Sequence, residues 1–138
     1  MTATVTDLTN LAEARAIAAA ADPADLNAAE ARARSNFAKA VRASDRAAAE
    51  MCAVFPTLPG GYRGAREVLH ALAQVNTVSD YERRRYLRLV EAFDAAEAHT
   101  DNMLDVVNVL RAENLRRNRV RNAARWERQL ATVVGIHA

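Results

Sequence analysis

The sequence predicts an all-α protein, an antiparallel bundle of four to five helices of which two are long. Three observations lead to this prediction. Of the 138 residues, 32 are alanine, the residue that best stabilises a helix. Only four glycines and three prolines are present, which leaves few turns, so the helices must be few and long. Large apolar residues recur at spacings of three and four along much of the chain, which is the period of a helix.

The length of the chain is that of one ordinary domain, so we predict a single helical domain over residues 1–138. Residues 1–8 show little periodicity and are expected to be frayed. Residues 111–134 form the most distinctive stretch, a helix rich in arginine near the carboxyl end.

The first two helices are predicted from the residues at which they begin. Thr9 or Asn10 can cap a first helix that runs to about Ala21. The sequence Asp22-Pro23-Ala24-Asp25 then combines an N-cap Asp, a proline at the first helical position and an acid in the first turn. It predicts a long second helix from Pro23 to about Val54.

The clearest break in the helical pattern is Phe55–Gly64, which holds two of the three prolines and three of the four glycines. Within it, Pro59-Gly60 fits the two central positions of a type II turn. A third helix is expected over about Gly64–Val75. The sequence Ser79-Asp80-Tyr81-Glu82 has the pattern of a capping box, so a fourth helix should begin there. Its inward face is expected to carry Tyr86, Leu89, Val90, Phe93 and Ala96.

A break or bend is expected near Thr100. An unbroken helix from Asp80 to Val134 would be roughly 80 Å long at 1.5 Å per residue. A compact domain of this size has a radius of gyration of only about 15 Å. The apolar run that follows, Met103–Leu110, is predicted to belong to the core.

The charge of the chain is small but unevenly distributed. The net charge is +2, yet residues 111–128 carry seven Arg and two Glu, which makes +5, so the other residues sum to −3. Wound at 100° per residue, this helix gathers its polar residues on one broad face that contains only Arg and Asn. Trp126 lies nearby. The residues of this predicted binding face are Arg111, Asn114, Arg117, Asn118, Arg121, Asn122, Arg125 and Arg128.

The leading hypothesis is a non-enzymatic binding protein that presents this face to RNA or DNA, or to an acidic protein surface. Arginine suits both, because its guanidinium group binds phosphates and carboxylates through two hydrogen bonds. The alternative is an oligomeric structural or assembly protein, whose alanine-rich helices pack on copies of itself or on a scaffold. A third interpretation is a face that is only solvated, or that is paired with acids such as Asp94, Asp101 and Asp105.

The sequence offers little for catalysis or for a cofactor. Glu67-Val68-Leu69-His70 has the Glu-x-x-His spacing of ferritin-like metal sites, so a metal-binding ferritin-like bundle is a further alternative. Such a site needs a second copy of the motif, and the chain has none. We therefore expect no metal, no cofactor and no enzyme. A second basic cluster, Arg83-Arg84-Arg85 with Arg88, has acids close enough to pair with part of it.

The expected location is the cytoplasm. Cys52 is the only cysteine, so no disulfide can form within the chain, which suits a reducing compartment. The first residues have neither the basic start nor the apolar run of a secretory leader, and no stretch is apolar enough to span a membrane.

Overall fold

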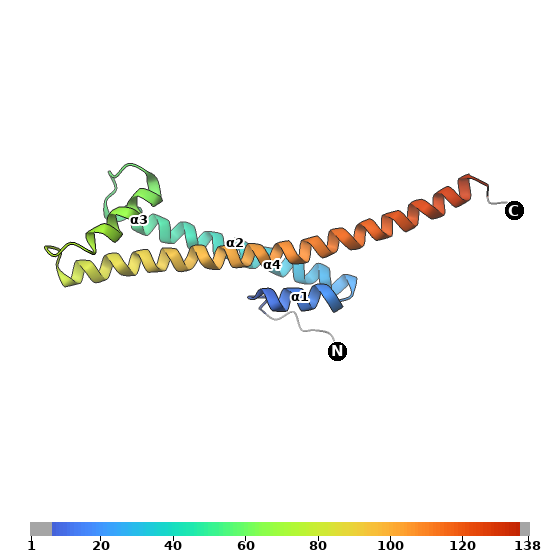
Figure 1. Ribbon diagram of the computed structural model, residues 1–138, viewed down its shortest axis with the longest axis horizontal. Coiled ribbons are helices and arrows are strands. Elements are labelled where there is room, and N and C mark those ends of the chain that lie inside the picture. Colours follow the sequence, from blue (N-terminus) through green and yellow to red (C-terminus); the bar gives the residue numbers. More distant parts are fainter. Residues whose placement is uncertain (1–6, 136–138) are drawn as a thin grey trace. The chain divides into compact units, whose positions relative to one another are not determined.

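The computed structural model describes residues 7–135, and this part of the chain contains helices and no strands. The helices are α1 (Leu11–Ala20), α2 (Pro23–Val54), α3 (Gly61–Leu72) and α4 (Asp80–Val133) (Figure 1). The all-helical prediction is confirmed. The two long helices that it included are α2 and α4, with 32 and 54 residues.

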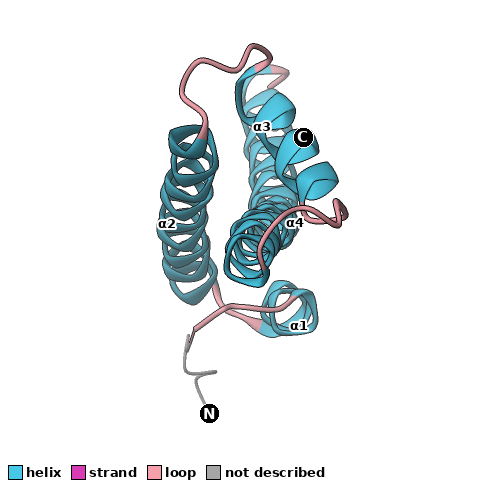
Figure 2. Ribbon diagram, turned by 90° about the vertical axis from the view of Figure 1, so that its left-hand side faces the viewer, coloured by secondary structure: helices cyan, strands magenta, loops and turns pink. Residues whose placement is uncertain are grey.

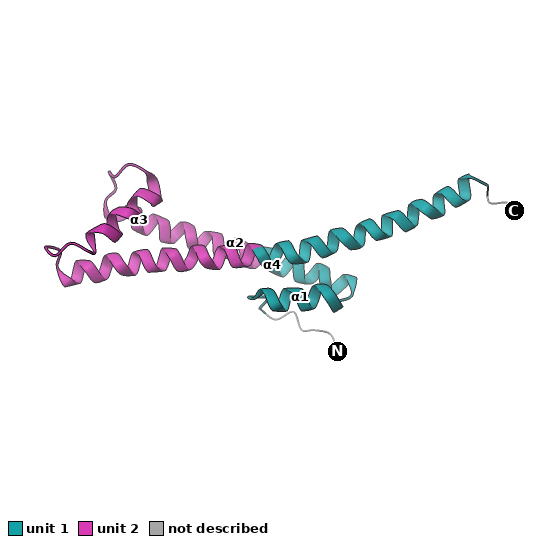
Figure 3. Ribbon diagram, viewed as in Figure 1, with its two compact units in different colours: residues 1–34, 105–138 teal, residues 35–104 magenta. Residues whose placement is uncertain are grey.

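The chain divides into two compact units, which share the long helices (Figure 3). Unit 1 comprises Met1–Arg34 and Asp105–Ala138, and therefore contains α1 with the beginning of α2 and the end of α4. Unit 2 is the continuous segment Ser35–Leu104, which contains α3 with the remainder of the long helices. The single-domain prediction stays a prediction, since the division does not measure independent folding.

Side-chain caps start three of the helices where the sequence places them. The side-chain oxygen of Asn10 accepts a hydrogen bond from the backbone N–H of Glu13 at 2.8 Å, and α1 begins at the next residue. The Asp22 carboxylate accepts one from the N–H of Asp25, also at 2.8 Å, and α2 begins at Pro23. The Ser79 hydroxyl accepts one from the N–H of Glu82 at 3.2 Å, ahead of α4. Each contact satisfies an N–H that the helix itself leaves unpaired.

The third helix begins and ends three residues earlier than predicted. Gly60 is its N-cap with φ 93° and ψ 5°, the values of the third residue of a type II turn, and α3 begins directly after it. The glycines inside the first turn had argued against a helix there. Gly64 is nevertheless required, because a Cβ at this position would lie 2.6 Å from the carbonyl oxygen of Pro59.

The core of unit 2 is formed by three helical segments that pack side by side (Figure 2). An ion pair on the surface links α3 to α4, because Arg66 donates two hydrogen bonds of 2.7 Å to the carboxylate of Asp94. This contact lowers the pKa of Asp94. The buried side chains of this core are Met51 from α2, Ala65, Leu69 and Ala73 from α3 and its end, and Tyr86, Val90 and Phe93 from α4.

The core of unit 1 is built from small and medium-sized side chains. Leu8 is 1% exposed and belongs to this buried set, so the expectation of a frayed start is wrong for this residue. Residues 1–6, to which the same expectation applied, lie outside the described residues. The buried members are Leu8, Ala14, Ile17, Leu26, Ala29, Ala33, Val106, Val107 and Leu110.

Helix α4 continues without interruption through Thr100, so the predicted break there is wrong. The Thr100 hydroxyl donates a 2.8 Å hydrogen bond to the carbonyl oxygen of Ala96, one turn earlier, and is thus accommodated inside the helix. Thr100 also keeps the spacing of the inward stripe between Ala96 and Met103. The expectation failed because it assumed one compact body, whereas each unit packs its own stretch of α4.

Candidate binding surface on helix α4

The predicted binding face divides into a part that unit 1 already uses and a part that is exposed. Asn114 and Arg117 are half-buried. The amide of Asn114 donates a 3.3 Å hydrogen bond to the carboxylate of Glu30 in α2. Arg117 donates to the carbonyl oxygens of Ala21 at 2.7 Å and Ala18 at 3.2 Å.

Arg117 therefore caps the carboxyl end of α1. The last carbonyls of a helix have no partner within it and carry a partial negative charge, which a guanidinium group neutralises. Helix α1 has no basic residue in its own last turn. In unit 2 Arg83 has the same role after α3, since it donates to the carbonyl oxygens of Ala73 at 3.1 Å and Val75 at 3.3 Å. Neither contact is visible in the sequence, because each donor belongs to α4 and its acceptors lie at the end of another helix or just after it.

Glu113 holds Arg117 and its neighbour Arg116. Its carboxylate accepts hydrogen bonds from Arg116 at 2.9 and 2.7 Å and from Arg117 at 2.9 Å. The pKa of Glu113 is lowered from 4.5 to about 2. Hydrogen bonding with Arg116 is the largest cause, and hydrogen bonding with Arg117 is the second largest. Two of the seven arginines of residues 111–128 are thus bound to a carboxylate of their own helix.

We expect the carboxyl group of Glu113 to titrate far below 4.5 in an NMR pH titration. Because this pKa is lower in the folded chain, its contribution to stability is complete above pH 4.5 and is lost as the pH falls from 4.5 through about 2. Arg116→Ala should raise the pKa of Glu113 toward 4.5, since it removes the largest cause of the shift. Arg119→Ala, at an exposed position, serves as the control and should leave this pKa unchanged. A wild-type pKa close to 4.5 would contradict the contact.

The remaining residues of the predicted face are exposed to solvent. Arg121 donates a hydrogen bond to the side-chain oxygen of Asn118, which is a neutral partner. Within residues 7–135, Arg125 and Arg128 lie in no ion pair. Asp94, one of the acids considered above as a partner of this face, is bound to Arg66 instead. The exposed members are Arg111, Asn118, Arg121, Asn122, Arg125, Trp126 and Arg128.

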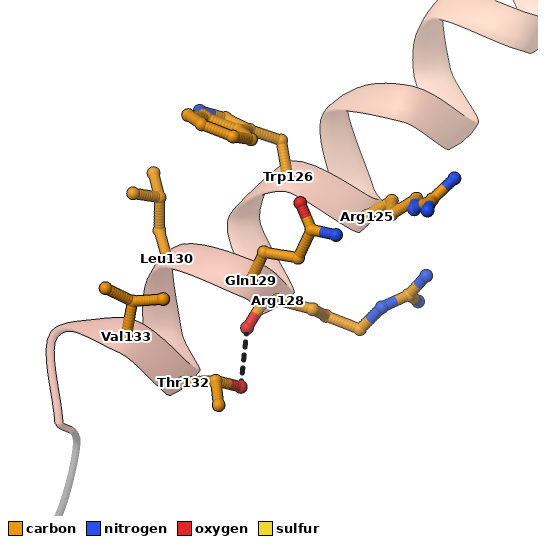
Figure 4. A pocket seen from close by; sticks show the side chains of 7 residues that line it. All are labelled: Arg125, Trp126, Arg128, Gln129, Leu130, Thr132 and Val133. Atoms are coloured by element: carbon orange, nitrogen blue, oxygen red, sulfur yellow. Dashed lines mark hydrogen bonds between the residues drawn. The ribbon is translucent and has the colours of Figure 1, made fainter.

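An open groove of about 570 Å³ runs along the last turns of α4 (Figure 4). Trp126, Leu130 and Val133 point to one side of the helix, whereas Arg125 and Arg128 point to the other (Figure 4). Gln129 and Thr132 complete its lining. The groove is therefore apolar along one rim and cationic along the other.

A smaller depression of about 250 Å³ lies beside the start of α2, within unit 1. Pro23, Arg116, Arg117, Val120 and Arg121 line it. Two of its three arginines share Glu113, so only Arg121 has no carboxylate partner here. The depression is thus less suited to an anion than the end of α4.

The other candidate residues of the sequence do not come together as a site within residues 7–135. No group of three His, Cys, Asp or Glu side chains gathers there as a metal site would require. Glu67 and His70 are both exposed. Cys52 is half-buried beside the core of unit 2. A search of the described helices finds none whose length and apolar character would let it cross a bilayer.

The chain was compared with protein-family models, with curated proteins and with solved structures, and none of the three comparisons gave a match.

Proposed function

We propose that this chain is a binding protein without catalytic activity, and that the end of α4 is its contact with an anionic macromolecule. One observation carries the proposal. Arg121, Arg125 and Arg128 follow one another at spacings of four and three, all are exposed, and none has a carboxylate partner within residues 7–135.

Elsewhere in the described chain some arginines are paired with carboxylates, whereas others, such as Arg84 and Arg85, are exposed and in no ion pair. Arg34, Arg66 and Arg83 form ion pairs with carboxylates, as do Arg116 and Arg117. By contrast, residues 118–133 carry four Arg and one Glu, which makes +3, so the other residues of the +2 chain sum to −1. A row of like charges on an exposed helix raises the local positive potential and attracts polyanions.

The ligand chemistry follows from the side chain. A guanidinium group binds a phosphate or a carboxylate through two parallel hydrogen bonds. RNA, DNA and an acidic protein surface all supply such anions in a row. Asn118 and Asn122, exposed beside the arginines, add neutral donors and acceptors.

Replacing Arg121 and Arg125 together by alanine should weaken polyanion binding and flatten its dependence on salt. Each phosphate contact that is lost changes the slope of log K against log salt by roughly 0.7 on a single strand and 0.9 on a duplex. Fluorescence anisotropy with a labelled single-stranded RNA, a DNA duplex and a poly-glutamate peptide, each over a range of salt concentrations, measures this slope.

The matched control is Arg84→Ala with Arg85→Ala. These two arginines also lie exposed on α4, but in unit 2, and their replacement removes the same charge. The slope should stay at the wild-type value in this control. An equal loss in both double variants would show that net charge, and not the proposed surface, governs binding. An unchanged slope in the Arg121/Arg125 variant would refute the proposal.

Self-assembly is the second candidate function. Leu115 and Val120, which lie on α4 ahead of the groove, are 48% and 58% exposed, so contact with another copy would bury apolar surface. In this proposal the antiparallel helices pack as a bundle within a homo-oligomer. The proposed location is the cytoplasm, because a single cysteine, Cys52, suits a reducing compartment. Light scattering on the preparation used for the binding experiment separates the two candidate functions. A stable oligomer that does not bind polyanions favours self-assembly.

A further inference from the structure

We propose that the groove on the last turns of α4 receives an acidic amphipathic helix of another protein. The inference rests on the proposed function, because it names the class of anionic partner that the same surface binds. Three features of the groove carry it: a row of exposed apolar side chains, a cationic row on the opposite rim, and the lack of any neighbouring helix over these turns.

The apolar row has the spacing of a helix-recognition surface. Trp126, Leu130 and Val133 stand at i, i+4 and i+7, and they are 62%, 43% and 81% exposed. Anchors with this spacing are how a helix docks against an apolar partner surface. Tryptophan in particular contributes much of the affinity of protein interfaces.

The cationic rim selects an acidic partner. Arg125 and Arg128 lie across the groove from the apolar row (Figure 4). An amphipathic helix with carboxylates beside its apolar stripe would meet both rims at once. A second copy of this segment would not, because both segments carry +3 over residues 118–133 and repel each other.

A nucleic acid fits the groove less well than such a helix. Single strands are bound by successive aromatic side chains on which bases stack. Here only Trp126 can serve in this way, whereas Leu130 and Val133 are aliphatic and offer no ring for a base. Two of the three side chains of the exposed apolar row therefore cannot stack on a base, but they match an apolar stripe on a protein.

The last turns of α4 are also accessible to a partner. Every residue from 118 to 130 is exposed, and all the residues that line the groove belong to α4 itself. In unit 1 the buried residues of α4 end at Leu110. The partner thus needs to displace nothing in order to reach the groove.

The test uses the full chain and its single tryptophan, Trp126, as the reporter. The probe is a synthetic heptad-repeat peptide with leucine at the a and d positions and glutamate at e and g. Saturable binding should shift the Trp126 emission to shorter wavelength, since the ring leaves water. Leu130→Gln should weaken binding by roughly tenfold or more, the loss typical of an interface anchor. Leu104→Gln, which changes an α4 leucine of similar exposure (41%) in unit 2, should leave the affinity unchanged.

Two further ligands make each outcome decisive. A peptide of the same composition with its leucines and glutamates scrambled is a polyanion without a stripe, and a single-stranded RNA is a polyanion of the other class. If the scrambled peptide or the RNA binds as tightly as the patterned peptide, and Leu130→Gln has no effect, the helix proposal is overturned while polyanion binding stands. If none of the three ligands binds, both proposals fail.

Discussion

Phe93→Ala is expected to lower the free energy of unfolding by about 3–5 kcal/mol, the usual cost of removing a buried aromatic side chain. Phe93 is 2% exposed in the core of unit 2. Its ring lies 5.5 Å from that of Tyr62, measured between centroids, so it also holds the start of α3 against α4. The substitution removes apolar contact area and leaves a cavity that three packed segments cannot fill.

Chemical denaturation followed by far-ultraviolet circular dichroism measures this loss. Tyr81→Ala is the matched control, because Tyr81 is an aromatic residue of α4 in the same unit but is 73% exposed. Its replacement should change stability by no more than about 0.5 kcal/mol. Equal effects of the two substitutions would contradict the assignment of Phe93 to the core.

Arg117→Ala is expected to lower the free energy of unfolding by about 1–3 kcal/mol, the range for hydrogen bonds to a charged group that leave a partner unsatisfied. The substitution removes two hydrogen bonds to the carboxyl end of α1 and one to Glu113. Lysine at this position keeps the charge but lacks the planar fork that reaches both carbonyls, so Arg117→Lys should recover only part of the loss.

The comparison with Arg125→Ala separates structure from function. Arg125 is exposed and has no ion pair within residues 7–135, so its replacement should leave stability within about 0.5 kcal/mol and should weaken polyanion binding. The same denaturation experiment serves for both variants. If Arg117→Ala were as stable as the wild type and lost polyanion binding instead, Arg117 would belong to the binding surface and its role as a cap would be refuted.

The positions at which the helices begin were determined by the sequence, because caps are local. Asn10, Asp22 and Ser79 each accept a hydrogen bond from an N–H three residues later, and such spacing is legible in one stretch of chain. Helix α2 begins at Pro23, as predicted, for the same reason, and its end at Val54 agrees with the predicted end at about Val54. The exposed cationic row was also predicted in part, since a period of 3.6 residues places Arg121, Arg125 and Arg128 together without reference to any other helix.

Only the tertiary structure decided which arginines are exposed and whether α4 is continuous. Arg117 shares its helical face with Arg121 and Arg125, yet it binds the carbonyl oxygen of Ala21, 96 residues away in the sequence. Periodicity states which face a side chain is on but not what lies opposite that face. For the same reason the sequence did not reveal that α4 continues through Thr100: the length a helix can reach depends on what its successive stretches pack against, and here two units each provide that support.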